Sequence, residues 1–324
     1  MNGHGIGAIL LTISLYVLIR TGVFSAAPLR NAPQRTNILS FAAIAVVFLV
    51  YVLAGGTFAI LARYLPPTQQ SSAIEIVSGL SAIAAACAFG TRWFEKGLSG
   101  LGIAARNIPR GVGLGILSFG IITPILYLVL VMTETVARDM THKLPPVHPA
   151  LKAMATDHSH VSVGLLVVLV VVIAPISEEL FFRGLIQSWL CQKLAGVSVK
   201  SPAAPDSHAY AISAPREGDD PASLADLAVR KAVFTDGGDS SPWPLGQWLP
   251  RNRWIAILIT ATVFAGVHYA VTPGYIEWFP SLFLLGVALG YIYELTGNIW
   301  TDITMHACFN LVPTLLILSG VKPK

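Results

Sequence analysis

Long apolar stretches dominate this sequence and constrain what it can fold into. A helix crosses the hydrocarbon core of a bilayer when about 20 consecutive residues are mostly apolar. Only 12% of the 324 residues are charged and 54% are hydrophobic, whereas an ordinary soluble domain carries roughly 25% charged residues. So few charges cannot cover the surface of a water-soluble protein of this length. The sequence therefore predicts an all-α, polytopic transmembrane helix bundle. About eight spanning helices are expected, near residues 5–24, 38–62, 72–91, 111–133, 163–189, 252–272, 280–296 and 299–319.

The basic residues are distributed unevenly between the two sets of loops. One side collects fourteen Lys and Arg residues and the other six, with Arg183 left inside a span. The positive-inside rule predicts that the richer side is cytoplasmic, which places both termini outside. Residues 1–19 contain no Lys or Arg, so they lack the positive region of a signal peptide and are counted as the first span. The net charge of +4 thus concerns topology, and it indicates no nucleic-acid partner.

One segment departs from the apolar pattern. From about residue 197 to 250 the chain is rich in Ala, Ser, Pro, Asp and Gly, so it cannot bury enough apolar surface to offset the entropy of ordering it. We predict a disordered cytoplasmic insertion there. The chain then divides into N-terminal transmembrane helices over 1–160 and a core over 161–319, which the insertion interrupts.

Several ionisable or strongly polar residues lie inside the predicted spans, where a charged group is costly and usually faces a cavity or a partner. In chain order they are Glu178, Glu179, Arg183, His268, His306 and Asn310. Glu179 and Arg183 are four residues apart, so on a helix they share a face and can pair. Glu178 is rotated by about 100° from Glu179. One carboxylate can therefore stay ionised beside the arginine while the other acts as a base.

His306 and Asn310 are also four apart and project from one helical face. With a carboxylate and a second histidine in an apolar bundle, they could activate water and stabilise an oxyanion. Each signal also has a structural explanation, because the Glu179–Arg183 pair could lock helices together and a lone His or Asn often makes interhelical hydrogen bonds. Asp302, four residues before His306, could orient its imidazole or serve as an N-cap or first-turn carboxylate.

Three short motifs connect these residues. They are Glu-Glu-x-x-x-Arg as EELFFR at 178–183, Phe-x-x-x-His as FAGVH at 264–268, and His-x-x-x-Asn as HACFN at 306–310. Their order and apolar setting resemble the CPBP family of intramembrane proteases, which contains the type II CAAX prenyl endopeptidases and the bacterial Abi, or bacteriocin-processing, proteins. The resemblance covers about residues 160–319, whereas the N-terminal helices vary within the family. The polar insertion departs from the family's pattern but lies outside the motif positions.

The resemblance implies hydrolysis of peptide bonds. Glu178 would be the general base that activates water, and His268 would help to hold that water. Arg183 would hold Glu179 and so orient the carboxylate pair. The implied substrates are membrane-embedded or lipidated peptides and proteins, including prenylated CAAX-type ones. The implied location is the lipid bilayer of a bacterial cell, as an integral multi-pass protein.

The resemblance further implies that His306 and Asn310 form the oxyanion site. A catalytic metal has been proposed for the family and disputed, and Glu178, His268 and His306 could bind zinc. No His-Glu-x-x-His helix is present, so we favour glutamate-activated water without a cofactor. His268 comes late in its predicted span and His306 early in the last one. Helix tilt, or a later start of the sixth span, would be needed to bring the two histidines to one depth.

Two other functions stay open at this point. A membrane scaffold or bacteriocin-immunity protein could keep these residues without using them. A transporter could use buried Glu, Arg and His side chains as an ion or proton pathway. The motifs name neither the substrate nor the oligomeric state.

Overall fold

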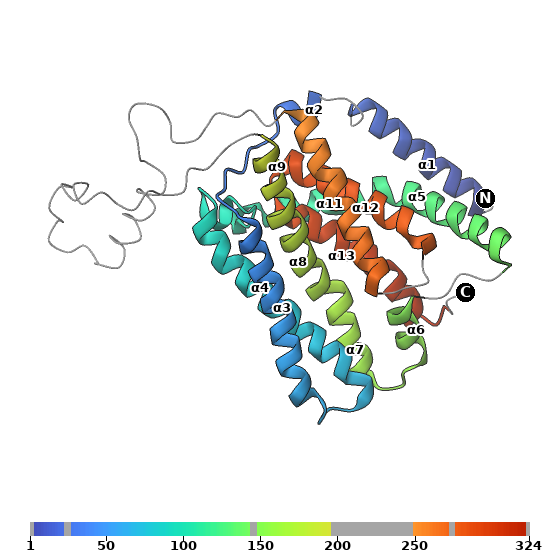
Figure 1. Cartoon of the computed structure of the whole chain (residues 1–324). Helices are drawn as coiled ribbons and strands as arrows, with labels where there is room; N and C mark the ends of the chain where they lie inside the picture. Colours follow the sequence, from blue (N-terminus) through green and yellow to red (C-terminus); the bar gives the residue numbers. More distant parts are fainter. Residues whose placement is uncertain (1–2, 23–26, 143–147, 196–248, 272–275, 322–324) are drawn as a thin grey trace, which may run out of the picture.

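The computed structural model describes residues 3–22, 27–142, 148–195, 249–271 and 276–321, and helices make up nearly all of this part of the chain (Figure 1). The described residues contain no β-strand, so the predicted all-α class is confirmed. The insertion predicted at about 197–250 lies almost entirely outside the described residues.

The N-terminal half contributes the helices that surround the motif-bearing core. They are α1 (Gly3–Arg20), α2 (Ala27–Arg30), α3 (Phe41–Ala62), α4 (Pro67–Trp93), the short 3-10 turns η1 (Gly97–Ser99) and η2 (Ala105–Asn107), α5 (Ile108–Thr141) and α6 (Pro149–Thr156).

The C-terminal half contains the three motifs. Its elements are α7 (His160–Val168), η3 (Leu169–Ile173), α8 (Ala174–Glu179), η4 (Leu180–Gln187), α9 (Ser188–Leu194), α11 (Pro250–Val271), η5 (Ile276–Trp278), α12 (Phe279–Thr296) and α13 (Ile299–Leu318). The five elements from α7 to α9 follow one another without a break and form one long helix. This helix carries the first motif, at 178–183, and is named the motif-bearing helix.

Seven helices among the described residues are long and apolar enough to cross a membrane. They correspond to the second through eighth predicted spans, and the protein is an integral, multi-pass membrane protein. The first predicted span, 5–24, is also helical, but only a shorter apolar stretch, Gly7–Arg20, is found there. This helix packs against α5.

Capping residues fix where α12 ends and where α13 begins. Gly297 follows α12 with φ of 58°, a left-handed conformation that glycine adopts without steric cost. The Asn298 side chain then accepts a hydrogen bond from the Trp300 backbone N–H at 3.3 Å and caps α13. This tight turn sets the depth at which α13, and with it the third motif, enters the bundle.

Close helix contacts hold the bundle together. Figure 1 shows α3 beside α4, and α4 in turn contacts α7 and α8. Another pair, α11 and α12, approaches so closely that a Cβ atom on Gly286 would lie 3.0 Å from Ala261 Cα. Lipid tails are as apolar as the side chains, so packing of this kind and interhelical hydrogen bonds hold spanning helices together.

A buried ion network lies at one end of the core. Glu294 of α12 is fully buried, and each of its carboxylate oxygens binds one arginine, Arg35 or Arg253. Gln187 donates a further hydrogen bond to Glu294 Oε1 at 2.9 Å. Arg35 also lies with its guanidinium carbon 4.1 Å from the centre of the Tyr293 ring. A single carboxylate thus joins the segment before α3, the motif-bearing helix, α11 and α12.

The ion network corrects one part of the charge count. Arg35 and Arg253 are two of the fourteen basic residues that the sequence analysis assigned to loops on the basic side, but they are 4% and 1% exposed. Arg253 additionally donates to the backbone carbonyls of Ala32 at 2.8 Å and Pro33 at 3.1 Å. The sequence did not reveal these pairs because Arg35 and Glu294 lie more than two hundred residues apart.

The network generates a stability prediction. Glu294→Ala leaves two buried guanidinium groups without their carboxylate, so we expect a loss of roughly 3–5 kcal/mol in unfolding free energy. Thermal unfolding of the purified protein in detergent measures this loss. Glu95→Ala is the matched control, because Glu95 is exposed in the loop after α4 and should leave the melting temperature unchanged. Equal melting temperatures for both variants would show that the network does not hold the bundle.

Candidate active site

Glu179 is the fixed point of the site. Its side chain is fully buried, and Oε1 accepts one hydrogen bond from Arg183 Nη1 at 3.1 Å and another from His306 Nδ1 at 2.8 Å. The pairing of Glu179 with Arg183, predicted from their spacing of four, is confirmed. Arg183 Nη2 also lies 3.4 Å from the carbonyl oxygen of Gly286. The first motif is thereby tied to both α12 and α13.

Glu178 points to a different set of partners. Its Oε2 lies 3.7 Å from His268 Nε2 and 3.9 Å from His306 Nε2. These distances are too long for direct hydrogen bonds. The side chains of Glu178 and His268 are 26% and 28% exposed, whereas His306 is 5% exposed. The two adjacent glutamates therefore separate, one buried and held, the other facing two imidazoles at an accessible edge.

The hydrogen bonds at Nδ1 of the two imidazoles fix which ring nitrogen carries the proton in the neutral form. His268 Nδ1 lies 2.8 Å from the Phe264 carbonyl oxygen, and a carbonyl only accepts, so Nδ1 carries a proton. His306 Nδ1 carries one for the same reason, because it binds the Glu179 carboxylate. In a neutral ring the other nitrogen, Nε2, is then an acceptor. Both acceptor nitrogens lie on the side of Glu178 Oε2.

The two histidines meet at one carboxylate despite their different positions along their helices. A later start of the sixth span is not the explanation, because α11 begins at Pro250. Helical side chains lean toward the start of their helix, and the His268 ring does so, contacting Phe264 one turn earlier. This direction helps His268 to reach the depth of His306.

Asn310 has a partner on the motif-bearing helix. Its Nδ2 donates a hydrogen bond to the Val170 carbonyl oxygen at 2.8 Å. Val170 lies in η3, a π-helical segment in which a carbonyl bonds the N–H five residues later. For Val170 that residue is Pro175, which has no N–H. Asn310 therefore supplies the donor that the backbone lacks, in addition to any role toward substrate.

The motif-bearing helix is π-helical on both sides of the glutamates. The two wide segments are η3 and η4, with regular helix only at Ala174–Glu179 between them. Single π-helical turns are rare and often occur at functional sites. The sequence alone did not predict these segments.

Phe264 is a site residue to which the sequence assigned no role beyond its place in the motif. Its buried ring has its centroid 4.5 Å from that of His268 and 5.9 Å from that of His306. The Arg183 guanidinium carbon lies 4.6 Å from the ring centre, a cation–π contact. Phe264 thus packs against both imidazoles and the arginine. Its position four residues before His268, on the same helical face, was the available signal.

Asp302 does not orient His306. The imidazole Nδ1 binds Glu179 instead, and neither oxygen of the Asp302 carboxylate accepts a hydrogen bond from another side chain in the described part of the chain. The N-cap of α13 is Asn298, so Asp302 is a first-turn carboxylate. It is fully buried beside the site.

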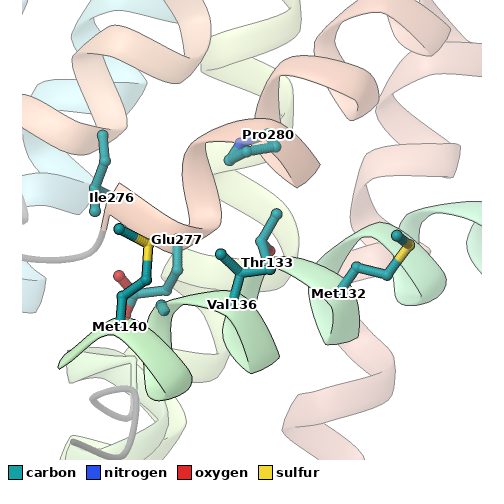
Figure 2. Close-up of a pocket in the computed structure, with 8 residues that line it drawn as sticks. Met132, Thr133, Val136, Met140, Ile276, Glu277 and Pro280 are labelled. Carbon is teal, nitrogen blue, oxygen red and sulfur yellow. The ribbon is translucent and has the colours of Figure 1, made fainter. Parts of the chain in front are cut away.

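A separate hollow lies between the second half of α5 and the start of α12. It has a volume of about 540 Å³ and is lined mainly by apolar side chains, with Glu277 as its one charged residue. Figure 2 shows the ribbon of α5 on one side of it and that of η5 and the start of α12 on the other, with Met140 and Glu277 close together. None of the six predicted site residues lines this hollow.

A metal was the alternative suggested for this site. A structural or catalytic zinc site needs at least three nitrogen, sulfur or oxygen side-chain ligands around one point. Among the described residues, no group of three or more His, Cys, Asp or Glu side chains is arranged to hold a metal ion. Zinc binding by Glu178, His268 and His306 therefore stays a prediction that the described geometry does not support.

The geometry of Arg183 generates a second stability prediction. Arg183→Ala leaves the buried Glu179 carboxylate without its guanidinium, so we expect a loss of roughly 3–5 kcal/mol. Arg183→Lys keeps the charge but not the planar fork that reaches Glu179 and Gly286 together, so its loss should be intermediate. Melting temperatures in detergent would order the three proteins. Identical values for Arg183→Ala and the wild type would contradict the pairing.

Comparison with known proteins places these motifs in a family. Residues 160–215 and 226–312 match the family model described as Type II CAAX prenyl endopeptidase Rce1-like. The match leaves out only 216–225, so most of the predicted insertion falls within it. No curated protein and no solved structure matches the chain. All six predicted site residues lie inside the matched stretches, and the family prediction made from the three motifs is confirmed. Residues 160–215 and 226–312 are thus similar to the Rce1-like type II CAAX prenyl endopeptidases.

Proposed function

We propose that this protein is an intramembrane endopeptidase in which Glu178 activates a water molecule to attack a substrate peptide bond. The match of residues 160–215 and 226–312 to the Rce1-like family model supports the protease class. One geometric observation carries the mechanism: Glu178 Oε2 lies 3.7 Å and 3.9 Å from the Nε2 atoms of His268 and His306.

The convergence of these three atoms favours water as their shared partner. With Nδ1 of each ring occupied by a donated hydrogen bond, the Glu178 carboxylate oxygen and the Nε2 atom of a neutral His268 ring are both acceptors. Acceptors separated by more than 3.5 Å are commonly bridged by water. A water molecule that donates one hydrogen to Glu178 and the other to His268 satisfies both of them and leaves its oxygen lone pair for attack.

The reaction then proceeds by proton transfer through Glu178. The water oxygen forms a bond to the carbonyl carbon of the scissile peptide as its proton moves to Glu178, and the carbonyl electron pair moves to oxygen. When the tetrahedral intermediate collapses, the C–N bond breaks and Glu178 returns the proton to the leaving nitrogen. The glutamate ends in its starting state, and no cofactor is consumed.

The oxyanion is assigned to His306 and Asn310. Donation from His306 Nε2 requires a ring that carries a proton on both nitrogens, with Nδ1 bound to Glu179, and in this scheme the ring keeps both protons throughout the cycle while Glu178 and His268 hold the water. Asn310 Nδ2 has two hydrogens and donates one to Val170, so the other remains for the oxyanion. Removing one donor of this kind costs about 10²–10³ in rate in other hydrolases.

The proposed substrates are membrane-embedded or lipidated peptides and proteins, with prenylated CAAX-type ones included. The family supports a substrate that is processed within the membrane. The proposed location is a bacterial cell membrane, supported by the resemblance of the three motifs to bacterial members of the wider CPBP family. A scaffold and a transporter are the competing functions.

Glu178→Gln tests the proposal most simply. The amide cannot accept the water proton, so we expect the rate to fall by about 10²–10⁴ with the melting temperature unchanged. Membrane-peptide proteomics of cells with the wild type or the variant should identify cleaved proteins, and purified protein in EDTA should then cleave them. Glu95→Gln, in an exposed loop, is the control.

The competing functions give other results in the same assays. A wild-type rate for Glu178→Gln would reject the base. If the wild type and the variants all bind these membrane proteins and none cleaves them, the protein is a scaffold. Charge movement across liposomes would indicate a transporter.

A second test determines which of two carboxylates near His306, that of Glu179 or that of Asp302, orients its imidazole. Glu179→Gln should lower kcat by about 10–100-fold, the range found when carboxylates that orient histidines are lost in metal sites, because it weakens the bond to Nδ1. Asp302→Asn should retain most activity, because Asp302 makes no hydrogen bond to the imidazole. The reverse order of kcat values would assign the orienting role to Asp302.

A further inference from the structure

Glu75 is a carboxylate inside an apolar span that the proposed mechanism does not use. It is the one acidic residue of α4. The described part of the chain contains no hydrogen bond or ion pair to its side chain. A carboxylate that faces lipid within a span is costly, and such groups normally face a cavity or a partner.

The position of Glu75 on the helix shows which of these applies. At 3.6 residues per turn, it lies on the same face of α4 as Ser72, Gly79 and Ala82, which are all buried. The lipid-exposed side is marked by Leu80, which is 49% exposed. Glu75 is nevertheless exposed. Its carboxylate therefore lies on the helix-facing side of α4 without being covered by the neighbouring helices.

The same face of α4 lies against the first motif. A Cβ atom on Gly79 would lie 2.6 Å from Ile173 Cγ2 and 3.6 Å from Ser177 Oγ, and Ser177 immediately precedes Glu178. One turn before Gly79, Glu75 lies within electrostatic range of Glu178, as does Tyr51 of α3. The exposed Glu75 thus lies one helical turn from the contact between α4 and the first motif, whose Glu178 is itself partly exposed.

Among the described residues, the negative charges of Glu75 and Glu178 are not matched by Lys or Arg side chains paired with them. Arg183, the buried cation of the first motif, is bound to Glu179. The basic groups paired with Glu178 are His268 and His306. In the part of the chain that the structure describes, no Lys or Arg is paired with Glu75 or Glu178, and two such carboxylates in an apolar surrounding create a negative potential that attracts a positive ligand.

We propose that Glu75 is a substrate-recognition residue, and that the site prefers peptides with a Lys or Arg side chain next to the scissile bond. The proposal rests on the endopeptidase function above and adds a charge preference to it. Glu75 binds the cationic side chain while Glu178 remains the base. The residue lies in the N-terminal half of the chain, outside the stretches that match the family model.

Matched peptides measure the preference. The probes are an apolar peptide with a single central lysine and the same peptide with acetyl-lysine or glutamate there. Cleavage by the full-length protein in nanodiscs is followed by mass spectrometry. For the wild type we expect kcat/KM for the lysine peptide to exceed that for acetyl-lysine by about tenfold, in line with one partly desolvated ion pair. The difference should lie in KM.

Variants at position 75 identify the residue responsible. Glu75→Gln should abolish the preference and leave the kcat for the acetyl-lysine peptide unchanged. Glu75→Lys should favour the glutamate peptide, and Glu75→Asp should restore part of the lysine preference. Asp139→Asn is the control, because Asp139 is a 72% exposed carboxylate at the end of α5. A preference that persists in Glu75→Gln, or its absence in the wild type, would overturn the proposal.

Binding separates this proposal from the proposed function. Dissociation constants for the same peptides are measured on Glu178→Gln, and on Glu178→Gln combined with Glu75→Gln. A lysine preference lost only in the double variant supports recognition even if no peptide is cleaved. Cleavage by the wild type without any charge preference contradicts the recognition role alone.

Discussion

The site depends on the compensation of one buried carboxylate. An ionised group inside an apolar bundle is stable only when it is paired and hydrogen-bonded, and Glu179 meets this condition through Arg183 on its own helix and His306 on α13. These two bonds fix the rotation of the motif-bearing helix. Glu178, the next residue on that helix, is thereby directed toward His268 and the Nε2 atom of His306. Glu179 thus has the structural role and Glu178 the proposed chemical role, although the two are adjacent residues of the same type.

A second buried carboxylate extends this principle toward the C-terminal end of the motif-bearing helix, two turns after Glu179. Glu294 binds Arg35 and Arg253, and Gln187 connects it to the helix that carries the glutamates. Because Arg35 precedes α3, the N-terminal half contributes a residue to the core that the family model matches. The N-terminal half also supplies Gly79, whose lack of a side chain lets α4 lie against the first motif. The N-terminal helices therefore complete the core.

Local patterns in the sequence predicted much of this arrangement. Apolar stretches gave the helical class and seven of the eight expected spans, and a spacing of four gave the Glu179–Arg183 pair. Pairs distant in sequence were missed, because no periodicity relates Arg35 to Glu294 or Asn310 to Val170. The same limitation explains why the possible orienting role of Asp302 was wrong. Asp302 shares a helix face with His306, but the His306 imidazole binds Glu179, a carboxylate on another helix. Glu75 was overlooked because one charge in a long apolar helix carries no motif.

The central claim is that water, and not a glutamate side chain, attacks the peptide carbonyl. Single-turnover cleavage in water enriched in ¹⁸O tests it directly by mass spectrometry of both the product and the protein. Direct attack by activated water predicts that the new carboxyl terminus of the product gains the label in the first turnover, while the protein fragment that contains Glu178 stays unlabelled. Label found in Glu178 after that turnover would show that the glutamate had formed a covalent bond to the substrate, and would contradict the account.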